Sequence, residues 1–265
     1  MGVKEIPNIN KRDKRLGEER LNNRGCLMRI TKYNNSLDML VEFQDEYRAV
    51  VHAAYRDFKE GNVKNPYSPN VYGGKIGIKY PSKLNGKMTK EYNVWIDMLQ
   101  RCFRKEWKSK NPTYKDVTCC DEWLLYENFY EWLHNQENFD KWLNGDRWAV
   151  DKDILVKGNK VYSPETCCLV PCIVNGLFTK SNAVRGDLPI GVSRFRDRFQ
   201  AQCKDPFVNK TKHLGLYPTS MQAFQVYKEY KEKIIKQVAE IEYKDKNITK
   251  QCYESMMNYI VEIID

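Results

Sequence analysis

The sequence predicts an α+β fold, because two different hydrophobic periods occur in separate parts of the chain. Apolar and polar residues alternate between residues 25 and 58, which is typical of strands joined by short polar turns. From Glu91 onward, apolar residues recur at helical spacing. We therefore expect a β-rich N-terminal module, a central strand–strand–helix region with flanking helices, and a C-terminal three-stranded sheet plus helix.

The N-terminal part is expected to form a basic flexible arm over residues 1–17 and a β-rich module over residues 18–78. One side of its first strands is apolar, at Cys26, Met28, Ile30, Met39, Val41 and Phe43. A third extended run follows from Tyr47 to Phe58 and ends at Gly61. Residues 79–90 are rich in Lys and Gly, which indicates a linker.

A central region is expected over residues 91–184, beginning with a helix. One face of that helix is apolar, at Val94, Trp95, Met98, Leu99, Cys102 and Phe103. A second helical stretch, from Trp123 to Leu133, carries a broad aromatic stripe. Stacking on nucleic-acid bases is one use for such a stripe, but its spacing fits burial in a packed core better.

The C-terminal module, residues 188–240, is expected to hold three strands and a helix capped by Thr219. Polar residues of the open sheet face are suited to DNA, since Arg pairs with guanine, Gln with adenine and Lys with phosphate. The expected DNA-binding residues are Arg194, Arg196, Arg198, Gln200, Gln202, Lys204 and Lys212. Residues 248–265 predict a terminal amphipathic helix that packs within the chain or forms a dimer seam.

Charge is unevenly distributed along the chain, which has a formal net charge of +9. Residues 1–32 carry nine Lys/Arg against four Asp/Glu, and residues 190–215 carry six against two. Residues 111–153 are acidic, with four Lys/Arg against ten Asp/Glu. The two basic regions are consistent with a polyanionic partner or with ordinary solvated surface, and charge alone does not decide between them.

Several classes of protein are disfavoured by the sequence. There is no run of about 18 apolar residues, so no membrane partner is expected. The first residues lack the apolar stretch of a secretory signal, so the nine Cys are expected to be reduced thiols in a cytoplasmic protein. The adjacent pairs Cys119-Cys120 and Cys167-Cys168 do not have zinc-ligand spacing and are interpreted as small buried hydrophobes.

Residues 148–182 read as a strand, a polar loop, a second strand and a short helix. This layout resembles the HNH (ββα-metal) motif of phage homing endonucleases. The resemblance implies that Asp151 and Asn175 bind a divalent metal, with Mg²⁺ expected if the site is active and no cofactor otherwise. Lys152 stands where the family has its catalytic His, which acts there as a general base.

The replacement of that His leaves two roles open for Lys152. An unperturbed Lys titrates near 10.4 and is a cation at neutral pH, so it is a poor base unless burial lowers its pKa. It could instead stabilise the charge of the phosphate in the transition state. A third alternative is that the site has lost its chemistry.

The order of residues from Gly191 to Tyr227 resembles the DNA-binding domain of plant ethylene-response factors (APETALA-like). Carrying the resemblance are Gly-Val-Ser at 191–193, the Arg-rich turn that follows, and Phe-Gln-Ala-Gln at 199–202. Phe199 departs from the family, which usually has Trp there. The resemblance implies binding to double-stranded DNA.

Three functions are therefore weighed. The first is a phage-type homing endonuclease acting on double-stranded DNA in the cytoplasm of a bacterial host, as a monomer or weak dimer. The second is a catalytically inactive DNA-binding protein on a nuclease scaffold, with Lys152 contacting phosphate. The third is a factor that binds and inhibits a host protein, for which the acidic middle region would imitate nucleic acid.

Overall fold

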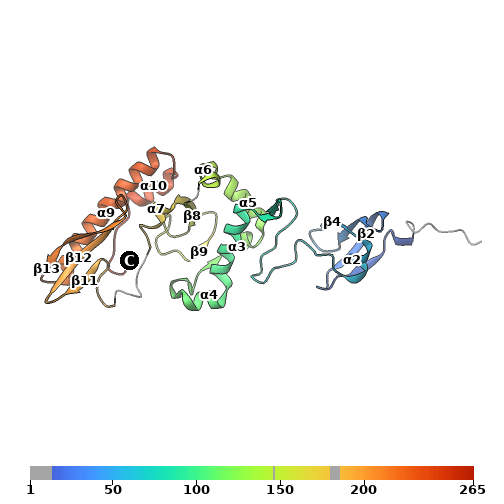
Figure 1. The fold of residues 1–265 in the computed structure, drawn as a ribbon, viewed down its shortest axis with the longest axis horizontal. Helices are drawn as coiled ribbons and strands as arrows, with labels where there is room; N and C mark the ends of the chain where they lie inside the picture. The colour runs from blue at the N-terminus through green and yellow to red at the C-terminus, as the bar shows by residue number, and fades with distance from the viewer. Residues whose placement is uncertain (1–13, 146, 180–185) are drawn as a thin grey trace, which may run out of the picture. The chain divides into compact units, whose positions relative to one another are not determined.

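The computed structural model describes residues 14–145, 147–179 and 186–265, and it has an α+β fold as predicted. Figure 1 labels its helices and strands. The chain divides into two compact units: Met1–Thr89 with Leu124–Asn128, and Lys90–Trp123 with Phe129–Asp265. Residues 1–13 of the expected basic arm and residues 180–184 of the expected central region lie outside the described residues.

The first unit contains a four-stranded antiparallel sheet in the order β1-β2-β3-β4. Its elements are β1 (Glu19–Leu21), β2 (Leu27–Asn35), β3 (Asp38–Phe43), β4 (Val50–Ala53) and the helix α2 (Tyr55–Glu60). The predicted alternation is confirmed in β2 and β3, whose inward side chains are fully buried: Met28, Ile30, Met39, Val41 and Phe43. Cys26 packs against the same core and is half-buried.

The extended run predicted from Tyr47 to Phe58 is wrong beyond Ala53, where the chain turns into α2. Phe58 is fully buried on this helix. Gly61 ends the helix in the left-handed region, with φ 73°, and its N–H bonds back to the carbonyls of Asp57 and Phe58. A six-residue helix is too short to show a clear helical period next to a strand, so the sequence pattern did not separate the two.

The region expected to be a linker, residues 79–90, contains a short hairpin of β5 (Lys83–Leu84) and β6 (Lys87–Met88). The chain before this hairpin is fixed by the buried carboxylate of Glu127. Its Oε1 accepts hydrogen bonds from the backbone N–H groups of Ile78, at 2.8 Å, and Lys79, at 2.7 Å. The hydroxyl of Tyr67 also donates to this carboxylate. The segment is therefore held in place by specific contacts.

The second unit begins with the predicted helix, α3 (Lys90–Phe103). The chain continues through α4 (Lys105–Lys110), η1 (Pro112–Tyr114), β7 (Thr118–Cys119), η2 (Asp121–Leu124), α5 (Tyr126–His134) and α6 (Phe139–Asn144). Of these residues, Leu124–Asn128 belong to the first unit. Burial of the aromatic stripe is confirmed, because Trp123, Phe129 and Leu133 are almost completely inside. The indole N–H of Trp95 donates to the carbonyl of Trp123 over 2.7 Å. The stripe therefore contributes mainly to a packed core.

The rest of the second unit holds the strand–strand–helix region and the C-terminal sheet. Its elements are β8 (Trp148–Asp151), β9 (Val161–Tyr162), β10 (Cys168–Pro171), α7 (Cys172–Asn175), β11 (Val192–Phe195), β12 (Arg198–Asp205), β13 (Lys210–Tyr217), α9 (Ser220–Lys244) and α10 (Lys250–Met257). As predicted, the side chain of Thr219 caps α9 by accepting from the N–H of Gln222. Ala223, Phe224 and Tyr227 of α9 are buried, and α9 packs on the sheet.

One hydrophobic core joins the regions that the sequence separated as 91–184 and 188–240. Cys168 and Val170 of β10 share this core with Val192 of β11 and Ala201 of β12. The terminal helix also packs into it, through Cys252 and Met256. That helix was predicted to reach residue 265 but ends at Met257, and Ile260 and Ile264 beyond it are exposed. The strand–strand–helix region and the sheet are therefore parts of one body.

Of the helices in the described ranges, none is both long enough and apolar enough to cross a membrane.

The sheet is held against α9 by a close approach at Gly191, which gives a testable prediction. Gly191 has φ +75°, and an added Cβ would lie 2.0 Å from the ring of Tyr227. Gly191→Ala should therefore lower the free energy of unfolding by about 3 kcal/mol in urea denaturation, because it combines backbone strain with overpacking. Gly158→Ala is the control: its φ is +77°, with open space around the added atom. It should cost only about 1 kcal/mol; equal losses would contradict the close packing at Gly191.

Candidate functional site

The strand–strand–helix geometry expected from residues 148–182 is present. β8 and β10 pair antiparallel, with Asp151 opposite Cys168 and Trp148 opposite Pro171. α7 follows β10 without a break and packs against both strands. Asp151 ends β8 and Asn175 ends α7, so the two predicted metal ligands lie on adjoining elements.

Asp151 is buried, with 9% of its surface exposed. Its Oδ1 accepts hydrogen bonds from the backbone N–H groups of Asp153, at 2.7 Å, and Ile154, at 2.9 Å. Burial raises the pKa of Asp151, although these hydrogen bonds act in the opposite direction. Within the part of the chain that the structure describes, Oδ2 has no hydrogen-bond partner. One oxygen thus fixes the turn after β8, and the other is available to a ligand.

Lys152 is buried as well, with 5% of its surface exposed. Its Nζ lies 2.7 Å from Oδ2 of Asp153 and 3.2 Å from the carbonyl oxygen of Asn159. Both neighbours are acceptors, so the side chain is placed to donate as an ammonium. A neutral amine would lose the ion pair with Asp153. The geometry therefore favours a fixed positive charge over a general base.

The loop after β8 is folded over Lys152 by Asn159. The Asn159 amide donates to the carbonyls of Lys152, at 2.8 Å, and Val161, at 2.7 Å. The rings of Tyr114 and Tyr162 lie 5.8 and 5.9 Å from the Lys152 Nζ, within the range of cation–π attraction. Lys152 is thus enclosed by groups that stabilise a cation.

Arg101 is a second cation near this cluster, and no sequence pattern pointed to it. Burial opposes its charge, but a hydrogen bond and charge interaction with Tyr162 raise the pKa of Arg101 above its ordinary value. The same interaction does not ionise the phenol, because burial raises the pKa of Tyr162. Arg101 lies on the side of α3 otherwise predicted as polar surface. Only the fold brings it to Tyr162 on β9.

The residues present fit a hard divalent cation such as Mg²⁺. The Oδ1 atom of Asp153 is buried and accepts no hydrogen bond from any described residue. The carboxylates of Asp151 and Asp153 and the amide of Asn175 are of the oxygen-ligand type that Mg²⁺ prefers. Among described residues, no three His, Cys, Asp or Glu side chains form a metal-binding group. Mg²⁺ sites commonly use one or two carboxylates and complete their ligands with phosphate and water.

His134 does not replace the missing catalytic His. It ends α5, and its ring centroid lies 3.9 Å from those of both Tyr130 and Phe139. Its Nε2 lies 3.4 Å from a carboxylate oxygen of Glu91. These contacts assign His134 to the packing of α3, α5 and α6.

The Cys pairs are not arranged as a metal centre. Cys167 and Cys168 are buried, as predicted, whereas Cys119 and Cys120 are half-buried. Burial raises the pKa of the Cys167 thiol to about 12, which disfavours the thiolate that zinc needs. Cys168 lies against Cys252 of α10, and that contact also raises its pKa.

The C-terminal sheet has one face covered by α9 and one open face. On the covered side, Val192 is paired with Ala201, and both are buried. Directly paired residues of antiparallel strands share a face, so the pairing defines the open side. The open face consists of Ser193, Phe195, Arg198, Gln200, Gln202, Lys204, Thr211, His213 and Leu216.

Two of the expected DNA-binding residues are not on this open face. Arg194 is paired with Phe199 on the helix-facing side, and its guanidinium lies 5.1 Å from that ring. Lys212 is paired with buried Cys203, and its Nζ lies 4.9 Å from the ring of Tyr230 on α9. The expectation that Arg194 and Lys212 lie on the open sheet face is therefore wrong.

The physical reason is a change of register at two points. The turn at Arg196-Asp197 pairs Phe195 with Arg198. As a result, Ser193 and Phe195 of β11 share a sheet face with Arg198 and Gln200 of β12, and Arg194 lies on the other face. A bulge between Ala201 and Gln202 then inverts the relation along β13. The bulge brings His213 to the open face, although the sequence analysis assigned this residue no function.

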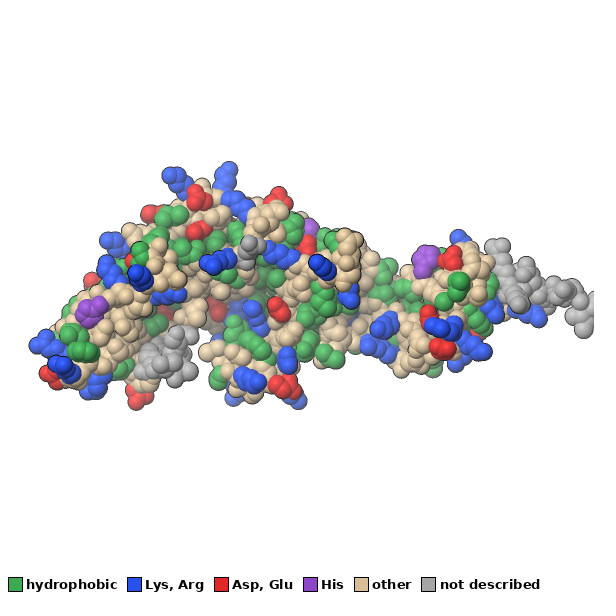
Figure 2. Space-filling model, viewed as in Figure 1, with side chains coloured by type: hydrophobic (Ala, Val, Ile, Leu, Met, Phe, Trp, Pro, Cys, Tyr) green, Lys and Arg blue, Asp and Glu red, His purple; other side chains and the backbone are tan. Residues whose placement is uncertain are grey.

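The open face carries positive charge without acidic partners. Arg198 and Lys204 are exposed, as is Arg196 at the turn, where φ is 54°. None of the three makes an ion pair with any described residue. Gln200 and Gln202 lie between them, with their amides 3.4 Å apart. Figure 2 shows Lys and Arg side chains over the region of β11, β12 and β13.

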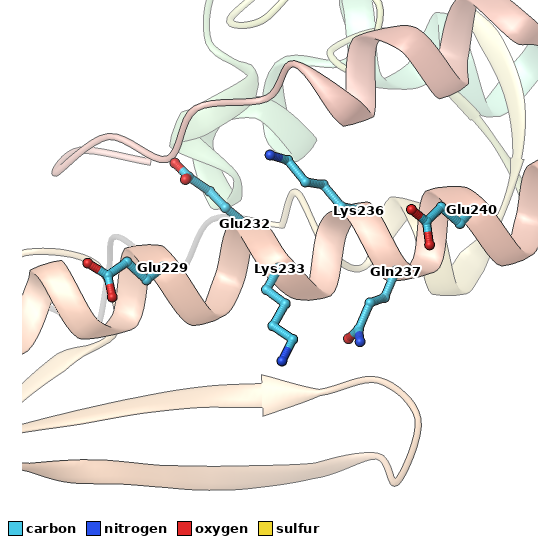
Figure 3. Close-up of a pocket in the computed structure, with 6 residues that line it drawn as sticks. All are labelled: Glu229, Glu232, Lys233, Lys236, Gln237 and Glu240. Atoms are coloured by element: carbon cyan, nitrogen blue, oxygen red, sulfur yellow. The ribbon is translucent and has the colours of Figure 1, made fainter.

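A hollow of about 430 Å³ on α9 is not a comparable site. Figure 3 shows its side chains pointing in different directions around the helix. Acidic and basic residues are mixed there: Glu229, Glu232, Lys233, Lys236, Gln237 and Glu240. Glu232 is already paired with Lys228 at 2.9 Å. This surface has no net charge pattern that selects a ligand.

Comparison with known proteins gives no match: no family model, no curated protein and no solved structure is similar to this chain. Inference of function therefore depends on the two features described above, the buried polar cluster after β8 and the open cationic sheet face.

Proposed function

We propose that the protein binds double-stranded DNA through the open face of β11–β13 and cleaves it with the help of a divalent metal held by Asp151 and Asn175. The observation that carries DNA binding is the set of exposed cations on this face, none of them ion-paired to any described residue. Unpaired Arg and Lys bind phosphates and guanine, and Gln reads adenine. A β-sheet can enter the major groove with its open face.

The buried cluster supports the cleavage step. A metal at Asp151 and Asn175 would supply positive charge for the transition state of phosphodiester hydrolysis. Asp151 is oriented for this by the two backbone N–H groups that hold its Oδ1. Lys152, fixed by Asp153 and Asn159, adds a second positive charge beside the metal ligands. We assign Lys152 an electrostatic role and no role as a base.

The test is a supercoiled-plasmid nicking assay with Mg²⁺ or Mn²⁺, run beside a gel shift on the same DNA. Nicking that EDTA removes, together with a shift, would support both parts of the proposal. A shift without nicking would support the inactive DNA-binding protein on a nuclease scaffold. No shift at low salt would reject DNA binding altogether.

Substitution of Lys152 separates its two chemical roles. Lys152→Gln should lower the cleavage rate by about 10² to 10³, the effect of removing one preorganised charge or donor. Lys152→Arg keeps the charge and should retain activity within about tenfold of wild type. DNA affinity in the gel shift should not change in either variant. Loss of cleavage in Lys152→Arg as complete as in Lys152→Gln would show instead that Lys152 does not act through its charge alone.

A further inference from the structure

The segment from Gly61 to Lys90, both included, carries only positive charge. It has six Lys and no Asp or Glu, which is unlike any other stretch of this size in the chain. We propose that the β5–β6 hairpin within it is a second DNA contact, which binds the phosphate backbone without reading sequence. This inference rests on the proposed function, because it assigns a further part of the same DNA to the first unit.

The hairpin has a defined shape that projects its side chains. Asn85 and Gly86 form its turn with φ values of 50° and 77°, as required in the tightest two-residue hairpins. Lys83 is paired with Met88, and Leu84 with Lys87. All four side chains are exposed. Because paired residues share a face, each side of the hairpin carries one Lys and one apolar side chain.

This distribution suits a groove of DNA. A two-stranded ribbon fits the major groove, whose two walls are phosphate backbones. A Lys on each side of the ribbon can reach the phosphates of a different wall.

The charge of the hairpin is uncompensated. In the same unit Arg29 is paired with Glu19, and Arg48 with Glu42. The side chains of Lys83 and Lys87 make no ion pair or hydrogen bond with any residue that the structure describes. Both ammonium groups of the hairpin are therefore available to a polyanion.

The hairpin is also held in position before DNA arrives. The Glu127 carboxylate binds the N–H groups of Ile78 and Lys79, just before the hairpin. The N–H of Thr89 bonds to the carbonyl of Ser82 at the base of the hairpin, over 3.1 Å. Preorganisation of this kind lowers the conformational entropy lost on binding.

The experiment measures DNA affinity as a function of salt for the double variant Lys83→Gln plus Lys87→Gln. Loss of two phosphate contacts should reduce the slope of log K against log salt by about 2. Between 50 and 200 mM salt, wild-type affinity should therefore fall about tenfold more than that of the variant. The matched control is Lys233→Gln plus Lys236→Gln, which removes the same charge from exposed positions of α9 and should leave the slope unchanged.

The outcomes distinguish this inference from the proposed function. Hydroxyl-radical footprinting should show one protected segment lost in the hairpin variant and the segment protected by the sheet retained. Wild-type binding with an unchanged slope and footprint in the hairpin variant would overturn the inference and leave the proposed function standing. Equal slope changes in hairpin and control variants would also overturn it, since they would report net charge alone. Absence of wild-type DNA binding would overturn both.

Discussion

Asp151→Asn should remove metal-dependent cleavage while leaving the fold and DNA binding intact. The Asn carboxamide oxygen can still accept from the N–H groups of Asp153 and Ile154, which Oδ1 of Asp151 accepts now. The substitution therefore removes the charge that attracts the metal and keeps the turn. We expect nicking to fall by about 10² to 10³, the equivalent of several kcal/mol of transition-state stabilisation.

The comparison with Asp151→Ala separates chemistry from folding. Alanine leaves two buried N–H groups without an acceptor, which costs about 1–3 kcal/mol each when no water replaces it. Asp151→Ala should therefore lose both activity and thermal stability, whereas Asp151→Asn should lose activity alone. An Asp151→Asn protein that nicks plasmid at the wild-type rate would remove Asp151 from the metal site.

Because burial raises the pKa of Asp151, the same residue links pH to stability and to activity. An acid whose pKa is raised on folding contributes stability below its unfolded pKa, and this contribution is lost as pH rises through the folded value. Metal binding has the opposite dependence, since it requires the carboxylate. Cleavage should thus increase with pH through the raised pKa of Asp151, while the Asp151 contribution to stability decreases.

The parts of this structure that the sequence predicted are those with local hydrophobic periods. Alternation between Met28 and Phe43 and helical spacing in α3 each depend on residues close in the chain. The strand–strand–helix order around Asp151 was likewise predictable, because turn residues separate short apolar runs. The alternation of apolar and polar residues cannot reveal a β-bulge, however. One extra residue in a strand moves every later side chain to the opposite face of the sheet.

The surroundings of Lys152 could not be predicted for a different reason. Asp153 and Asn159 are near it in sequence, but Tyr114 and Arg101 come from elements that only the fold brings to this loop. The sequence left open whether Lys152 is a base or a charge. The acceptors around its Nζ favour the second role, and no local pattern encoded that arrangement.

The register of the C-terminal sheet predicts that two neighbouring arginines differ strongly in their importance for DNA. Arg198 is on the open face, opposite Phe195, whereas Arg194 faces the helix side, over the ring of Phe199. Arg198→Gln should weaken binding to a duplex selected by the wild-type protein about tenfold to a hundredfold, the effect of losing one bidentate base contact. Arg194→Gln removes the same charge from the other face and should weaken it less than about threefold.

The pair Lys204→Gln and Lys212→Gln extends this test across the bulge. Lys204 shares the open face with Arg198, and Lys212 is held near Tyr230 of α9. Measured by fluorescence anisotropy, Lys204→Gln should lose more DNA affinity than Lys212→Gln, although both substitutions change the net charge equally. If Arg194 and Lys212 instead matter more, DNA lies on the helix side of the sheet. Equal effects within each pair would mean that net charge, and not the geometry of one face, determines binding.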